Sequence, residues 1–260
     1  MTANEQQLRQ QIVDVGKLVF DKGWGAANDG NISVRLDDHR VLCTPTGVSK
    51  GMMKPEDMIV CDMNGDKIEG RLGCTTELCM HLAIYGLRPD VGSVLHAHPP
   101  VATGFAAAGR GLNVAVLPEV IVNFGSIPLA SYGLQGTPEL TESILPFIPN
   151  YNAILMENHG AVAYGEDLWK AYFRMETVEH SARILLVAEL LGGPKVLPRF
   201  EVQRLFEARK RYGVEARNSM EPGNPVVAED LDPGQREYRF TRDELVALIE
   251  EALRSRGLEV

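Results

Sequence analysis

The predicted fold depends on the stretch Val91-Gly92-Ser93-Val94-Leu95-His96-Ala97-His98. Apolar runs of this kind form buried strands, and two prolines that favour a turn follow this one. Strand side chains alternate between the faces of a sheet, so His96 and His98 point to the same side. His159 closes a second apolar run, which begins at Tyr151. Two strand ends would thus present three imidazoles to one catalytic divalent metal, with a fourth position open for substrate.

The composition predicts one large α/β domain in a soluble, cytoplasmic protein. The 260 residues can bury a sizeable core, and 45% hydrophobic and 23% charged residues are ordinary for a globular chain. A net charge of −9 argues against nucleic acid as a partner. The first residues lack the pattern of a signal peptide, and no apolar run is long enough to span a membrane. The four cysteines lack zinc-knuckle spacing, which favours reduced, mostly buried thiols.

Local patterns predict alternating helices and short strands. An apolar stripe at Leu8, Ile12, Val15 and Val19 predicts a helix over residues 5–22. Strands are expected at 31–36, 40–44 and 58–62, the last before an Asn64-Gly65 hairpin turn. Further helices are expected at 75–87, at 101–109, from Thr137-Pro138 onward and, as the longest, at 166–191.

The character of the chain changes after Gly192, which divides it into a main domain of residues 1–192 and a C-terminal appendage of residues 193–260. Residues 200–212 resemble a basic amphipathic helix, and residues 214–240 are rich in proline, glycine and charge. The capping box Thr241-Arg242-Asp243-Glu244 predicts a last helix over residues 245–254.

Three further motifs carry small polar side chains and glycines. They are Asn28 to Arg35, Thr44 to Ser49, and Thr75-Thr76-Glu77 at a predicted helix N-terminus, where free amides favour anions. Each motif alone is more typical of a structural turn or cap. Equally, the three histidines taken alone could be unrelated polar residues at strand ends. His39, His81 and His180 are interpreted as packing or surface groups.

Five segments in order resemble the class II aldolase/adducin family, and within it the L-fuculose-1-phosphate aldolase branch. The resemblance runs from about residue 5 to residue 191. The segments are Gly30 to Arg35, Thr44 to Gly47, Thr75 to Glu77, His96 to His98 and Asn158 to Gly160. It implies a three-layer α/β/α fold with a central mixed, largely antiparallel sheet, and a homotetramer with its sites between subunits.

The resemblance also implies a role for each matching residue. His96, His98 and His159 would bind Zn²⁺, with Mn²⁺ or Co²⁺ as substitutes, and the metal would act as a Lewis acid. Glu77 would be the acid–base carboxylate. The phosphate of a small phosphorylated sugar would lie among neutral side chains and amides, namely Asn28, Asn31, Thr46, Gly47, Thr75 and Thr76.

This sequence departs from the family pattern at two places. Several aldolases of this branch have threonine where Asn28 aligns. They also place a tyrosine in the segment that matches Leu117 to Ile121, where this chain has none. Glu119 lies nearest, as a functional substitute or a surface carboxylate, and Tyr132 follows as a packing residue or a substrate contact.

The implied activity is reversible cleavage of a sugar or deoxysugar 1-phosphate into dihydroxyacetone phosphate and a short aldehyde. Sugar-phosphate 4-epimerases, methylthioribulose-phosphate dehydratases and keto-acid phosphate decarboxylases share the scaffold. The epimerases usually have aspartate at the position of Glu77, so Thr75-Thr76-Glu77 favours an aldolase. A non-catalytic, adducin-like interaction domain would not need a complete ligand set.

Overall fold

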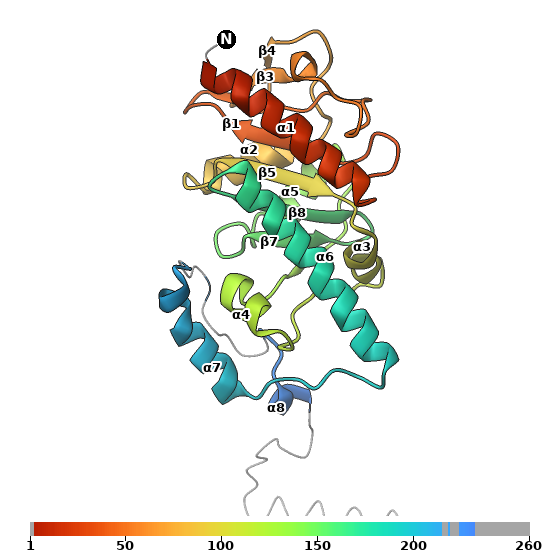
Figure 1. Cartoon of the computed structure of the whole chain (residues 1–260), viewed down its shortest axis with the longest axis vertical. Helices are drawn as coiled ribbons and strands as arrows, with labels where there is room; N and C mark the ends of the chain where they lie inside the picture. The colour runs from red at the N-terminus through yellow and green to blue at the C-terminus, as the bar shows by residue number, and fades with distance from the viewer. Residues whose placement is uncertain (1–2, 215–217, 219–223, 232–260) are drawn as a thin grey trace, which may run out of the picture.

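A mixed sheet forms the centre of the molecule in the computed structural model, which describes residues 3–214, 218 and 224–231 (Figure 1). Within that part of the chain, eight strands pair in the order β4-β3-β2-β1-β5-β8-β7-β6. Only β6 and β7 run parallel, and the other neighbours are antiparallel. The strands are β1 (Asn31–Arg35), β2 (Arg40–Cys43), β3 (Ile59–Asp62), β4 (Lys67–Glu69), β5 (Ser93–Ala97), β6 (Leu129–Ala130), β7 (Ala153–Met156) and β8 (Gly160–Gly165).

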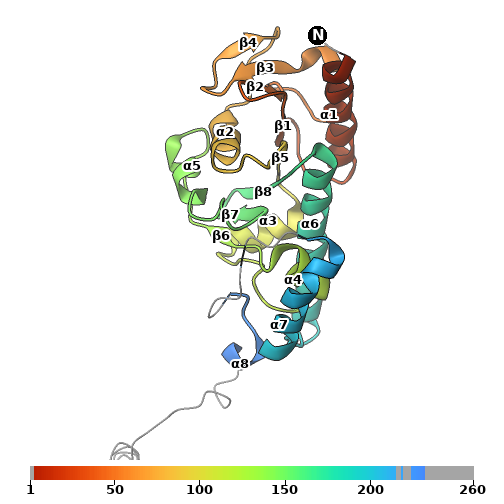
Figure 2. The same ribbon diagram turned by 90° about the vertical axis from the view of Figure 1, so that its left-hand side faces the viewer.

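Helices cover both faces of this sheet (Figure 2). On one face lie α1 (Ala3–Asp21), α3 (Pro100–Ala107) and α6 (Leu168–Leu190), and on the other lie α2 (Leu78–Leu87) and α5 (Pro138–Ile144). Because both faces are covered, β5, β7 and β8 are buried along their whole length. Leu95 points to the α1 side and Val94 to the α2 side, as strand alternation requires. The predicted three-layer α/β/α class is confirmed.

A smaller group of helices packs below the sheet in Figure 1. It comprises α4 (Pro118–Phe124), α7 (Arg199–Ala208), a 3₁₀ turn at Arg209–Tyr212 and α8 (Ala228–Leu231). Ile121, Val202 and Val227 form its apolar centre, so part of the predicted appendage rests on α4. The capping box at 241–244 and the helix at 245–254 lie outside the described residues. The division at residue 192 stays a prediction.

Most predicted elements are found within two residues of their expected ends, including the hairpin turn, where Gly65 has a φ of 92°. The start of α2 was predicted wrongly. Thr75, Thr76 and Glu77 precede the helix: Cys74 forms a β-bridge with Pro45, a turn at Thr76 and Glu77 follows, and Glu77 is the N-cap. The sequence analysis also missed α4, β4, β6 and β8, and a further 3₁₀ turn at Pro55–Asp57. In the described part of the chain, no helix is long and apolar enough to cross a bilayer.

A buried histidine interrupts the apolar packing between α2 and β1. His81 has no exposed surface, and its two ring nitrogens lie 2.7 Å from Ser33 Oγ and 2.6 Å from Asn31 Oδ1. Burial lowers the pKa of His81 to about 4, although the negative charge of Glu77 acts in the opposite direction. The imidazole is therefore neutral at pH 7.

This shift makes the fold sensitive to acid. In the unfolded chain His81 takes up a proton near its ordinary pKa of about 6.5, whereas the folded protein excludes that proton until about pH 4. The free energy of unfolding should therefore decrease as the pH is lowered from about 6.5 to about 4. Within this range His81 contributes up to about 1.4 kcal/mol per pH unit. Urea unfolding of the metal-free protein at pH 7, 6 and 5 should show a shallower slope for His81→Gln. Tyr85→Phe, which loses a hydroxyl beside Ser33, should lower stability without changing the slope, and equal slopes for all three proteins would contradict this account.

Candidate metal and substrate site

Three histidines converge at one edge of the sheet. His96 is near the end of β5, His98 follows that strand, and His159 lies in the turn between β7 and β8. One ring nitrogen from each lies within 4.8 Å of the others. The approach is close because Gly160 has no side chain: a Cβ there would lie 2.6 Å from His98 Cδ2. The predicted trio is thus assembled by the β7–β8 turn packing against the end of β5.

The imidazoles are oriented so that unprotonated nitrogens face one another. His96 Nδ1 lies 2.9 Å from the carbonyl oxygen of Ala161, which only accepts, so Nδ1 carries the proton and Nε2 is bare. On the outer side of His98, Nδ1 lies 3.5 Å from the Asp29 carboxylate. Burial lowers the pKa of His96 to about 3 and also lowers that of His98. These rings are therefore neutral at pH 7, as metal ligands must be.

Glu77 lies directly beside the trio. Its carboxylate oxygens are 3.1 Å from His159 Nε2 and 3.4 Å from His96 Nε2, and the amide of Asn31 donates to it at 2.7 Å. Burial raises the pKa of this carboxyl, but positive charge at His96 and His159, from a proton or a bound cation, and the Asn31 hydrogen bond outweigh burial, so the pKa is lowered. Glu77 is therefore ionised and can accept a proton.

The donor set fits a divalent metal. His98 Nε2 lies 3.1 Å from the bare His96 Nε2, and two facing lone pairs repel unless a cation or proton lies between them. Among the described residues, His159 Nδ1, His159 Nε2 and Glu77 Oε1 are buried without a hydrogen-bond partner; the 3.1 Å pair between the last two lacks hydrogen-bond geometry. Three imidazoles around an open position are what Zn²⁺ and similar ions require.

A cavity of about 430 Å³ adjoins this trio and collects the predicted phosphate residues. Its walls contain Asn28, Asn31, Thr46, Gly47, Thr75, Thr76, Glu77 and His98. These groups are neutral donors, apart from Glu77 and the histidine. Behind the wall, the buried Lys50 Nζ donates to the carbonyls of Asn28 and Val48 at 3.0 and 2.8 Å. Lys50 thus ties two of the loops together, and burial lowers its pKa to about 8.

Two predicted residues lie elsewhere, and others were missed. Glu119 is exposed on α4 and Tyr132 is 57% exposed, and neither belongs to the described lining of the cavity. The lining also includes Asp29, Gln135 and Gly136, which the sequence analysis did not single out. Asp29 lies inside the motif Asn28 to Arg35, so its place in that motif could have indicated that it lines the cavity.

A second cluster of potential ligands consists of three thiols. The sulfurs of Cys43, Cys61 and Cys74 lie within 4.8 Å of one another beside apolar side chains. Burial raises the pKa of Cys74 to about 11, and the hydrogen bond with Cys43 and burial raise that of Cys61. Cys61 and Cys74 are therefore protonated at pH 7, whereas metal binding needs thiolates. Cys79 is exposed, contrary to the expectation of mostly buried thiols.

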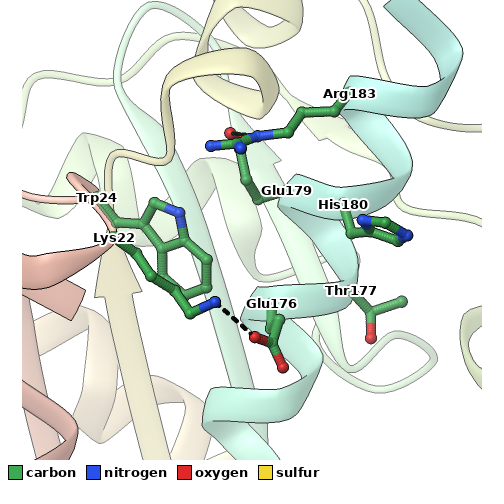
Figure 3. Close-up of a pocket in the computed structure, with 7 residues that line it drawn as sticks. All are labelled: Lys22, Trp24, Glu176, Thr177, Glu179, His180 and Arg183. Atoms are coloured by element: carbon green, nitrogen blue, oxygen red, sulfur yellow. Dashed lines mark hydrogen bonds and ion pairs between the residues drawn. The ribbon is translucent and has the colours of Figure 1, made fainter. Parts of the chain in front are cut away.

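A larger hollow of about 510 Å³ lies between the end of α1 and α6 (Figure 3). Its acidic and basic side chains are paired: Lys22 Nζ lies 2.8 Å from Glu176, and Arg183 Nε lies 2.7 Å from Glu179. Glu179 also accepts from the first amides of α3. We therefore interpret this hollow as structural. Trp24, at its edge, accepts a hydrogen bond from the backbone of His98 at 2.7 Å and so supports the histidine site.

Comparisons with known proteins agree with this geometry. The family model of the class II aldolase and adducin N-terminal domain matches residues 10–186. The chain is 31% identical over 211 residues to the 5-deoxy-D-ribulose 1-phosphate aldolase of Bacillus thuringiensis serovar kurstaki, with 80% of this chain and 98% of the relative covered. It is 30% identical over 199 residues to the 3-oxo-tetronate 4-phosphate decarboxylase of Pectobacterium atrosepticum, with 75% and 89% covered.

A solved L-fuculose 1-phosphate aldolase superposes with a TM-score of 0.74 at 29% identity, covering 81% of this chain and 98% of that one. The family match spans most of the α/β/α core, together with Glu77 and the three histidines. This chain belongs to the class II aldolase and adducin family.

Proposed function

We propose that this protein is a metal-dependent aldolase that reversibly cleaves a sugar or deoxysugar 1-phosphate. The products would be dihydroxyacetone phosphate and a short aldehyde. The observation that carries this proposal is the ionised Glu77 carboxylate 3.1 Å from His159 Nε2, beside a cavity with neutral anion-binding groups. An acid–base group, a metal trio and a phosphate pocket are thereby within reach of one small substrate.

In the proposed mechanism the protein binds and orients the substrate, and Glu77 transfers a proton. His96, His98 and His159 would hold Zn²⁺, which acts as a Lewis acid toward the carbonyl and hydroxyl oxygens of the substrate. The amides and hydroxyls around Thr46, Gly47 and Thr75 would anchor the phosphate. In the synthesis direction, Glu77 would take a proton from the hydroxyl-bearing carbon next to the carbonyl of dihydroxyacetone phosphate. In the cleavage direction it would return that proton.

The second candidate is decarboxylation of a keto-acid phosphate, which the relative in Pectobacterium favours by its name. Purified protein should be assayed with deoxypentulose and deoxyhexulose 1-phosphates for aldehyde release, and with 3-oxo-tetronate 4-phosphates for CO₂ release. CO₂ release without aldehyde formation from any sugar phosphate would reject the aldolase in favour of the decarboxylase.

The remaining functional expectations from the sequence stay predictions. The 4-epimerase and dehydratase alternatives, the homotetramer, the choice of zinc over manganese or cobalt, and the cytoplasmic location stay predictions. The substrate contacts of Glu119 and Tyr132 do as well. An adducin-like interaction domain would be favoured if the protein bound no divalent metal.

Replacing His96, His98 or His159 by alanine should remove the metal and the activity together, because each supplies one of three ligands. Metal content per chain after dialysis, measured by mass spectrometry, checks this outcome. Cys74→Ser is the matched control, because the thiol cluster should not hold the ion, and it should keep full metal content. Full occupancy in all three histidine variants, or loss in Cys74→Ser alone, would contradict the assignment.

Glu77→Gln should retain the metal but slow hydrogen exchange at the reactive carbon of dihydroxyacetone phosphate by about 10²–10⁴-fold, since the amide cannot accept the proton. Proton NMR in heavy water follows this exchange without an aldehyde. Glu142→Gln, on the exposed side of α5, serves as the control and should exchange at the wild-type rate. A wild-type rate for Glu77→Gln would refute the proposed role.

Combining Thr46→Ala with Thr76→Ala should raise KM for phosphorylated substrates by about 10²–10⁴-fold, because each of the two lost hydrogen bonds to a charged group costs about 1.5–3 kcal/mol. Unphosphorylated analogues should change by less than about threefold, since they never make those bonds. Steady-state kinetics on matched pairs of substrates measure both effects. An equal loss for both members of a pair would show that the cavity does not bind the phosphate.

A further inference from the structure

A continuous chain of buried hydrogen bonds leads from the inner side of α2 to the Glu77 carboxylate. Tyr85 Oη lies 2.8 Å from Ser33 Oγ, which lies 2.7 Å from His81 Nδ1. On the other side of the ring, His81 Nε2 lies 2.6 Å from Asn31 Oδ1, and Asn31 Nδ2 donates to Glu77 Oε2 at 2.7 Å. All five residues are less than 9% exposed.

The placement of the Asn31 amide determines the direction in which these bonds run. Asn31 Nδ2 faces Glu77 Oε2 and Asn31 Oδ1 faces His81 Nε2, so the NH₂ group donates to Glu77 and the oxygen accepts from His81. The neutral His81 ring has one N–H, which must then be on Nε2 to reach that oxygen. His81 Nδ1 is left as an acceptor and receives a hydrogen bond from the Ser33 hydroxyl. Ser33 Oγ in turn accepts from Tyr85. Each donor in the chain thereby has one acceptor.

An asparagine amide can present either end to a neighbour, because its oxygen and nitrogen are similar in size. The wrong end would place the Asn31 oxygen 2.7 Å from a carboxylate oxygen with no proton between them, and the carboxylate would move away. The other carboxylate oxygen, Glu77 Oε1, is the one nearest His159. Among the described residues it has no hydrogen-bond partner. The Asn31 contact is therefore the hydrogen bond that sets the position of this carboxylate.

We propose that His81 is a positioning residue, which locks the Asn31 amide so that its NH₂ group holds Glu77 in the orientation for proton transfer. This proposal rests on the proposed function, because it assigns His81 a task only if Glu77 transfers the proton. His81 lies four residues after Glu77, on the same side of the chain as it enters α2. The sequence alone favours a packing or surface role for His81.

A double-mutant cycle tests whether His81 acts through Asn31. His81→Leu should lower kcat for hydrogen exchange in dihydroxyacetone phosphate by about 10–100-fold at unchanged metal content, the loss typical when a supporting partner is removed. His81→Gln should recover most of the rate, because its amide N–H can still donate to Asn31. In the Asn31→Ala background, His81→Leu should change kcat by less than about threefold, since the group it orients is absent.

The control is Tyr85→Phe, which alters the far end of the same chain while Ser33 can still donate to His81. Its kcat should stay within about threefold of wild type. The proposal is overturned if His81→Leu exchanges at the wild-type rate, or if its loss is undiminished in the Asn31→Ala background. It is also overturned if His81→Gln is as slow as His81→Leu while both remain folded by thermal unfolding.

A second measurement does not depend on activity. Long-range proton–nitrogen NMR of the metal-free, full-length protein should show His81 neutral at pH 7 with its proton on Nε2. A proton on Nδ1 would reverse the hydrogen-bond chain and overturn the proposal, even if His81→Leu does not fold. If the wild-type protein exchanges no hydrogen with any metal, the proposed function fails, whereas the NMR result still decides the orientation of the Asn31 amide.

Discussion

The antiparallel register of β5 between β1 and β8 is the constraint on which the site depends. His96 lies opposite Asn31 on one side and opposite Val162 on the other. Directly opposed residues have neighbouring side chains, so this register places the amide that contacts Glu77 beside the His96 imidazole. The same pairing brings the β7–β8 turn, and with it His159, to the end of β5. A shift of one residue would turn His96 to the opposite face and separate the trio.

The electrostatics of the site follow from burial. Burial raises the pKa of Glu77, whereas positive charge at His96 and His159 and the Asn31 hydrogen bond lower it. Burial also disfavours the charged form of His96 and His98, so these two rings are neutral. A bound cation would supply the missing positive charge. This arrangement also explains how a protein with a net charge of −9 can accommodate a phosphate: local amides and hydroxyls bind it, and no broad positive field is needed.

Much of the core and site could be predicted from local patterns. The stripe from Leu8 to Val19 and the alternation through His96 and His98 each express the period of a single element, which a sequence displays directly. Other features depend on contacts between segments far apart in the chain. Cys74 pairs with Pro45, and α2 begins only at Leu78. Strand β8 is rich in glycine and alanine, so it carries a weak apolar signal and owes its state to pairing with β5 and β7.

The sequence by itself singled out the three histidines and Glu77, through ordered motifs that resemble one family, and the alternation of helices and strands, which depends on short spacings. Only the tertiary structure decided that Glu119 and Tyr132 lie outside the cavity and that Asp29 and Gln135 line it. It alone also decided that His81 contacts Asn31. That contact joins residues fifty positions apart, and local sequence has no period that reports such a distance. Its geometry comes from packing α2 against β1, which is a property of the whole sheet.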